Sequence, residues 1–105
     1  MDFKQFAEKL GLEEDEYLEL LELFIDTSAT DIANLENAVG TKNADEAEKA
    51  AHSLKGASAS LGLTEIAELA KQIEKSAREG STKDGVELLE SIKEKIIGIK
   101  ELMGE

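Results

Sequence analysis

The chain has no cysteine, no proline and no tryptophan among its 105 residues, and only 4% of its residues are aromatic. Without cysteine, it can form neither a disulfide framework nor a thiolate metal site. With so few aromatic residues, a core has to be built from Leu, Ile, Val and Ala. The absence of proline favours long helices over sheets. The length suits one domain with a single core, covering residues 1–105.

Positive charge is also scarce, because 24 acidic residues face 12 basic ones and give a formal net charge of -12. Binding to nucleic acid requires clustered cations, and so does binding to an anionic membrane. No apolar run approaches the roughly 20 residues of a membrane span, and the N-terminus lacks the apolar core of a signal peptide. We therefore expect a cytoplasmic protein with neither nucleic acid nor a membrane as a partner.

Four glycines divide the chain, and each follows a stretch of periodic apolar residues: Gly11, Gly40, Gly62 and Gly80. A glycine in the left-handed conformation commonly ends a helix at such a point. The glycines therefore predict five helices. These lie near residues 3–10, 14–39, 44–61, 65–79 and 83–103.

Capping residues support the predicted helix starts. Asn43 can cap the third helix while Glu46 reaches back to it, as in a capping box. Thr64 is placed to cap the fourth helix, and Ser81 or Thr82 is placed to cap the fifth.

Apolar side chains recur at spacings of three and four in each long helix, which is typical of a helix with one buried face. Representative positions are Leu21, Ile25 and Leu35, then Ala51 and Leu54, then Ile66, Ile73, Ile92 and Ile96. Short loops between long helices imply antiparallel neighbours. We therefore predict an all-α fold, an antiparallel up-down four-helix bundle. The short first helix, with Phe3, Phe6 and Leu10, should cover one end.

The single histidine, His52, lies in the third predicted helix but outside its apolar face. On a helical wheel of about 100° per residue, that face centres on Ala51 and Leu54, so the imidazole should face solvent. The same outer side carries Lys55, Gly56 and Ala59. Imidazole is a nucleophile near neutral pH, since its unperturbed pKa is about 6.5. An exposed imidazole beside a cation and bare backbone is well suited to hold a phosphoryl group.

Each of these residues also has a plainer interpretation. A lone surface histidine is usually just a polar residue, and Lys55 could be a solvated charge. Gly56 costs a helix about 1 kcal/mol relative to alanine, and it could allow close packing against a neighbouring helix. The three residues together, at offsets of zero, three and four, are much less expected by chance.

The segment HSLKGASASLG, residues 52–62, resembles the motif of the histidine-containing phosphotransfer (HPt) domain, roughly H-x-[LI]-K-G-x-[AS]-x-x-[LFI]-G. The matching residues are His52, Leu54, Lys55, Gly56, Ser58, Leu61 and Gly62. The helix plan extends the resemblance over nearly the whole chain. The resemblance implies a phosphorelay intermediate in which His52 accepts a phosphoryl group at Nε2 and exchanges it with an aspartate of a response-regulator receiver domain. Lys55 would offset charge on the phosphoryl oxygens, and Gly56 would leave the approach open.

The resemblance also implies the partners, a receiver domain and a sensor histidine kinase. The sequence contains neither a GxxxxGK[ST] loop nor a kinase-type GxGxxG, so we expect a phosphoryl carrier and not an enzyme. We expect no cofactor and no metal site, since the receiver would bring the metal, and we expect a monomer. The Met1 start and a helix ending near the C-terminus favour a free-standing protein, although a piece of a larger kinase stays open.

In HPt domains a polar residue on the next helix often bonds the imidazole Nδ1, and alignment through Gly62 places Glu74 there. A carboxylate accepting from Nδ1–H would leave Nε2 free. The alternative is that Glu74 pairs with Arg78 one turn further along. Gln72 is a second candidate partner, but its helical phase points away.

Leu20, Leu23 and Phe24 lie off the main apolar stripe of the second helix, so with Ala59 they could form a docking patch for a receiver. The alternative, which we favour slightly, is that Phe3 and Phe6 cover them.

The acidic run at residues 13–16 could suggest a cation site. It fits better as the start of a helix, where negative charge is favourable. Two other functions remain open at this point. One is a helical interaction module in which His52 is incidental. The other, less favoured, is an enzyme with His52 as general base.

Overall fold

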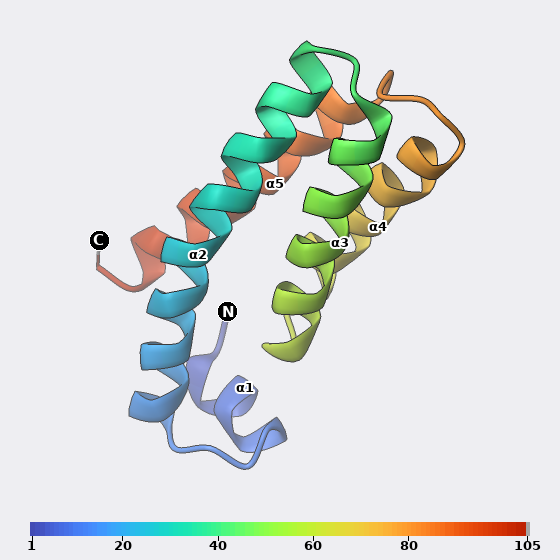
Figure 1. The fold of residues 1–105 in the computed structure, drawn as a ribbon. Coiled ribbons are helices and arrows are strands. Elements are labelled where there is room, and N and C mark those ends of the chain that lie inside the picture. Colours follow the sequence, from blue (N-terminus) through green and yellow to red (C-terminus); the bar gives the residue numbers. More distant parts are fainter. Residues whose placement is uncertain (105) are drawn as a thin grey trace.

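The computed structural model describes residues 1–104, and this part of the chain is all-helical. Its five helices are α1 (Phe3–Lys9), α2 (Glu14–Gly40), α3 (Ala44–Ser60), α4 (Thr64–Arg78) and α5 (Gly85–Leu102) (Figure 1). Each boundary lies within two residues of the prediction. The agreement follows from the local origin of the signals, which are apolar periodicity and helix-ending residues.

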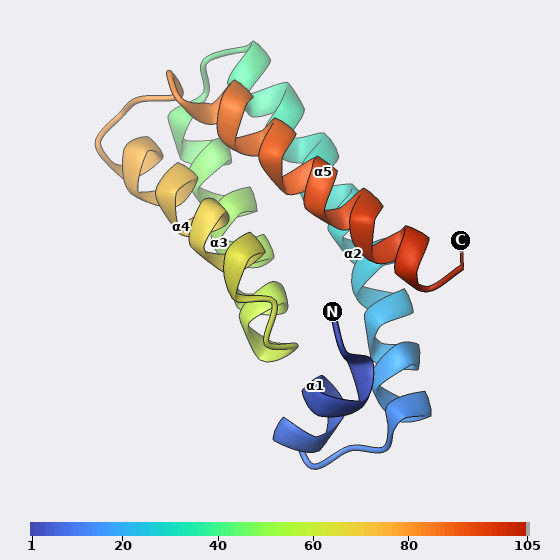
Figure 2. The same ribbon diagram turned by 180° about the vertical axis from the view of Figure 1, so that it is seen from behind.

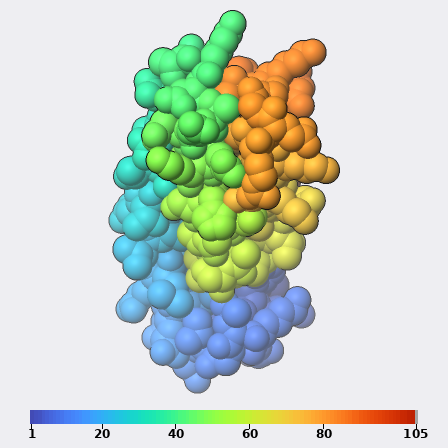
Figure 3. Space-filling view, turned by 45° about the vertical axis from the view of Figure 1, so that its right-hand side comes forward, coloured from blue at the N-terminus to red at the C-terminus, as the bar shows by residue number. Residues whose placement is uncertain are grey.

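The four long helices run alternately up and down, which confirms the predicted bundle (Figure 2). Helix α3 packs against α2 and α4, while α5 packs against α4 and α2, and the backbones of α3 and α5 do not approach each other closely. Figure 3 shows the face on which α3 (green) lies between α2 (cyan) and α4 (yellow to orange). This face therefore carries the outer side of α3.

Helix α1 covers one end of the bundle, as predicted. It packs against α2, and Phe6 reaches the turn between α3 and α4. There the Phe6 ring lies 3.6 Å from the position that a Cβ on Gly62 would occupy. Gly62 itself has a φ of 74°, so it ends α3 in the left-handed region that glycine tolerates best.

The core is built mainly from aliphatic side chains and alanine, as the composition required. Fully buried members include Leu21, Leu35, Leu54, Ile66 and Ile92. Tyr17, which the periodicity argument did not select, is also fully buried. Its hydroxyl donates a 2.6 Å hydrogen bond to the carbonyl of Leu61 and so ties the first turns of α2 to the end of α3. Burial raises the pKa of Tyr17 to about 12.

Some helix ends differ from the predictions. Gly40 is the last residue of α2 and does not adopt a positive φ; Lys42 takes the left-handed conformation instead, with a φ of 58°. The chain still turns within a few residues, because the Asn43 N–H returns to the Ala38 carbonyl at 2.8 Å. Tight backbone bonding can thus hold a non-glycine residue at a positive φ.

Two predicted N-caps are wrong. The Asn43 side chain does accept from the Glu46 N–H at 3.2 Å, as expected, but the Glu46 side chain does not bond back to Asn43, so the predicted capping box is only half formed. Leu63, however, precedes α4, and Thr64 is its first helical residue.

Asp84, and neither Ser81 nor Thr82, precedes α5. The first residue of α5 packs closely against α2, because a Cβ on Gly85 would lie 2.6 Å from a methyl group of Val39. This contact between distant segments is invisible to a local capping rule.

Candidate functional site

His52 projects from the middle of α3 on the side that faces away from the core. Its side chain is 70% exposed, while the neighbouring residues Ala51 and Leu54 are fully buried. The helical phase of the sequence therefore placed the imidazole correctly in solvent.

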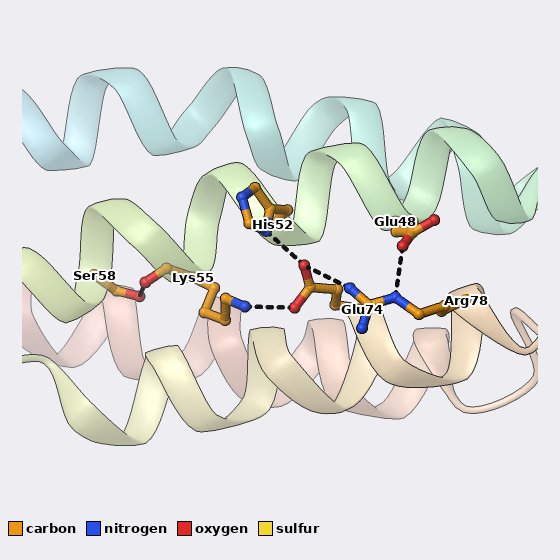
Figure 4. A network of polar contacts seen from close by, with 6 residues as sticks. All are labelled: Glu48, His52, Lys55, Ser58, Glu74 and Arg78. Carbon is orange, nitrogen blue, oxygen red and sulfur yellow. Dashed lines mark hydrogen bonds and ion pairs between the residues drawn. The ribbon is translucent and has the colours of Figure 1, made fainter.

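Glu74, on α4, contacts the imidazole directly (Figure 4). Its Oε2 lies 2.6 Å from His52 Nδ1, and its Oε1 accepts a 2.6 Å hydrogen bond from the Lys55 ammonium. The Glu74 side chain is only 5% exposed although it is charged. One buried carboxylate thus joins the histidine and the lysine of α3.

The electrostatics of the site keep Glu74 ionised. The hydrogen bond from Lys55 is the main cause that lowers the pKa of Glu74; burial opposes it, and the contact with His52 lowers the pKa further. An ionised carboxylate can only accept hydrogen bonds, so Nδ1 must be the protonated ring nitrogen. In the neutral imidazole this leaves a lone pair on Nε2, the nitrogen that does not contact Glu74.

The backbone beside the histidine is unobstructed at Gly56. A Cβ built there meets no atom within 4 Å, so the close-packing explanation for this glycine is wrong. Ala59, one turn further along, is exposed, and Lys55 is partly exposed. Ser58 turns inward and donates to the Leu54 carbonyl at 2.7 Å. The outer side of α3 therefore carries little side-chain bulk C-terminal to His52 and is open to solvent.

Arg78 joins the same cluster from the other side of Glu74. Its Nη2 lies 3.5 Å from Glu74 Oε2, and its Nε donates to Glu48 on α3 at 2.9 Å. The two expected arrangements of Glu74, bonding to His52 and pairing with Arg78, are therefore both formed. Gln72 is exposed, and Glu74 rather than Gln72 bonds the ring.

Glu48 is a member of the cluster that the sequence argument missed. It lies four residues before His52, hence one turn away on the same side of α3. That spacing was a usable signal. Its partner, Arg78, however, is on α4. The residue spacing within one helix does not predict the distance between two helices.

The predicted docking patch is only partly exposed. Leu20 and Leu23 are 41% and 57% exposed, so α1 does not cover them, whereas Phe24 is 3% exposed and belongs to the core. Including Phe24 in a surface patch was wrong. It continues the buried row of Tyr17, Leu21 and Ser28 at spacings of four and three, so it points inward with them.

The acidic run begins α2, as preferred from the sequence, with Glu14, Asp15 and Glu16 in the first helical turn. Within residues 1–104, no group of three or more His, Asp or Glu side chains is arranged to hold a metal ion. No helix in this range is long and apolar enough to cross a membrane.

Fold and site together define a helical bundle that presents one exposed histidine tethered to a buried glutamate. The model of the Hpt domain family matches residues 19–102, so the chain belongs to this family. Proteins of this family are phosphocarriers and not kinases, and membership supports a phosphotransfer role in a phosphorelay.

A solved structure with the same architecture is histidine-containing phosphotransfer protein B from Pseudomonas aeruginosa PAO1. It is 29% identical and superposes with a TM-score of 0.83 over 97% of this chain and 89% of that chain. No curated protein matches the sequence.

Proposed function

We propose that this protein is a phosphorelay intermediate that accepts a phosphoryl group on His52 Nε2. The group would come from a sensor histidine kinase or a receiver phosphoaspartate, and it would leave to a receiver aspartate. The supporting observation is the exposed imidazole whose Nδ1 lies 2.6 Å from the buried Glu74 carboxylate. That contact would orient the ring and leave Nε2 as the nitrogen that reacts.

The transfer step needs no proton acceptor in this protein. The Nε2 lone pair attacks the phosphorus of the aspartyl phosphate, and the P–O bond to the aspartate breaks with its electron pair going to the carboxylate. The ring keeps its Nδ1 proton and becomes a phosphorylated imidazolium. Glu74 lies against Nδ1 and offsets the positive charge. In the reverse direction, a receiver carboxylate attacks the phosphorus and the N–P bond breaks toward Nε2.

Lys55 and Gly56 serve the phosphoryl group in different ways. A phosphoryl group in transit needs charge neutralisation and positioning more than covalent help. Lys55 lies three residues after His52, on the same side of α3, and supplies the cation. Gly56 leaves space for the partner's active site, since a Cβ there would meet open space.

Leu20, Leu23 and Ala59 are the residues we assign to receiver docking. The hydrogen bond from Ser53 to Asp31, 2.9 Å long, sets the register of antiparallel α2 and α3. Residues of α2 before position 31 therefore lie alongside the C-terminal half of α3. An apolar contact there would sit beside the open stretch that follows His52.

A phosphotransfer assay tests the proposal. A receiver domain labelled on its aspartate should transfer label to the wild-type protein and not to His52→Gln, and the label should be acid-labile and base-stable. Gln72→Ala, altered at an exposed position of α4 that does not bond the ring, is the matched control and should be labelled normally. Equal labelling of the wild type and His52→Gln would remove this residue from the mechanism. Receiver binding without any labelling would instead favour a helical interaction module.

A further inference from the structure

Glu74 is flanked by two cations that are held in different ways. Within residues 1–104, Lys55 has one ion-pair partner, which is Glu74 itself. Arg78 is shared between two carboxylates, Glu48 on α3 and Glu74 on its own helix. The lysine is thus free to leave by breaking one contact, whereas the arginine is anchored twice.

Phosphorylation would create a competing site for the lysine. A phosphoryl group carries between one and two negative charges at neutral pH, and on Nε2 it would lie on the solvent side of the ring. The Lys55 ammonium contacts Glu74 at 2.6 Å in the unphosphorylated protein, and Glu74 lies against Nδ1 and not Nε2. Movement of the ammonium toward phosphoryl oxygens on Nε2 would weaken that contact.

The departure of Lys55 would leave the negative charge of Glu74 less well compensated. The carboxylate is 5% exposed, and a buried charge that loses its partner is strongly destabilised. In the unphosphorylated arrangement, Lys55 is the main group that lowers the pKa of Glu74, whereas Arg78 interacts more strongly with Glu48 than with Glu74. The Arg78 guanidinium stands at 3.5 Å, within reach of closing on Oε2 without releasing Glu48 from its Nε.

From this geometry we propose that Arg78 is a positioning residue that takes over the charge of Glu74 when Lys55 turns to the phosphoryl group. The inference rests on the proposed function of His52. Figure 4 shows the arrangement it requires, with Lys55 and Arg78 approaching the same carboxylate from opposite sides. Without Arg78, Lys55 would have to stay with Glu74, and the phosphoryl group would lose its cation.

A double-mutant cycle on the transfer rate tests this coupling. Arg78→Gln should slow transfer about fivefold to tenfold in the wild-type background, the size expected for one charge-assisted contact. In the Lys55→Gln background it should slow transfer less than about twofold, because no lysine remains to be diverted. Arg78→Lys should restore most of the rate. An equal slowing in both backgrounds would overturn the proposal.

Glu48→Gln is the matched control for the bridge between α3 and α4. It removes the charge of that bridge, but its amide oxygen can still accept from Arg78, so the cation stays beside Glu74. Stability, measured by urea unfolding, should fall less than in Arg78→Gln, and the transfer rate should stay within about twofold of wild type. If Glu48→Gln slows transfer as much as Arg78→Gln, the bridge matters and the proposed compensation is wrong.

A second measurement does not depend on transfer at all. The carboxyl carbon of Glu74 can be titrated by NMR in Lys55→Gln, which imitates the departure of the lysine. We expect its pKa to stay below the ordinary 4.5 in that variant and to rise when Arg78→Gln is added. Identical titrations in the two variants would overturn the role of Arg78. A wild-type protein that accepts no label would overturn the proposed function instead, so the two failures are distinguishable.

Discussion

At the scale of single residues, the site depends on one buried carboxylate surrounded by donors. Hydrogen bonds from Lys55 and His52 keep Glu74 ionised although it is only 4% exposed. Its ionised state in turn places the proton on His52 Nδ1. The tautomer of an exposed ring is thus set by a residue that solvent hardly reaches.

Replacing Glu74 by glutamine should therefore disturb both the ring and the pH dependence of stability. Two-bond 15N–1H spectra should show a mixture of His52 tautomers in the variant, against an Nδ1–H form in the wild type. The unfolding free energy at pH 7 should fall by about 1–2 kcal/mol, because a charge-assisted hydrogen bond is lost.

The difference in unfolding free energy between wild type and Glu74→Gln should depend on pH in a defined direction. The pKa of Glu74 is lower in the folded protein than its ordinary 4.5, so its stabilising effect is present above pH 4.5 and is lost as pH falls through the folded value. The unfolding free energies of wild type and Glu74→Gln should therefore become more similar as pH falls through that range. Glu68→Gln, an exposed position on the same helix, should show no such narrowing.

At the scale of secondary-structure elements, α3 contains a residue that weakens it. A glycine inside a helix is unfavourable by about 1 kcal/mol relative to alanine, and at Gly56 no close packing offsets that cost. The open space beside His52 is what the missing Cβ provides. Helix α3 is therefore less stable at the position where an approaching partner would need space.

Gly56→Ala should separate stability from activity. The helix should gain about 0.5–1 kcal/mol in unfolding free energy, measured in urea, while transfer from a phosphorylated receiver slows. Gly98→Ala is a matched control, since Gly98 also lies inside a helix with open space at its Cβ position, and the backbone of α5 does not approach that of α3 closely. It should stabilise the protein without slowing transfer. Faster or unchanged transfer in Gly56→Ala would remove the steric argument.

At the scale of the whole molecule, a few long-range contacts fix how the helices sit. Tyr17 bonds the carbonyl at the end of α3 from the start of α2, and Ser53 bonds Asp31 midway along the same pair. These contacts set the register between α2 and α3. The register in turn decides which part of α2 lies beside the open stretch of α3.

The chain contains one tyrosine and no tryptophan, so the ionisation of Tyr17 can be followed alone by absorbance. Its pKa is raised from 10.0 to about 12, so its contribution to stability is complete below pH 10 and is lost between pH 10 and about 12. Tyr17→Phe should cost about 1–3 kcal/mol at pH 7, because a buried carbonyl loses its donor. In urea titrations the variant should lack the steep alkaline loss of the wild type. Parallel alkaline curves would show that the hydrogen bond contributes little.

Receiver docking can be tested on the exposed leucines of α2. Leu20→Ser together with Leu23→Ser should weaken receiver binding, measured by calorimetry, by about tenfold, since apolar contacts at an interface centre carry much of the affinity. Ile97→Ser is the control, as that residue is similarly exposed at 53% but lies on α5. Equal losses for both changes would place the receiver elsewhere.

The sequence by itself determined the helix boundaries within two residues, the bundle class and the exposure of His52. These follow from periodicity along a single helix, which depends on neighbours three and four residues apart. The contact of Glu74 with the ring was also predicted, but only through the resemblance to HPt domains.

Tertiary structure alone decided the hydrogen bond of Tyr17, the close approach of Gly85 to Val39 and the ion pair between Glu48 and Arg78. Each depends on how closely and in what register two helices approach each other. That distance is set by the packing of the whole core, so no local pattern in either helix contains it.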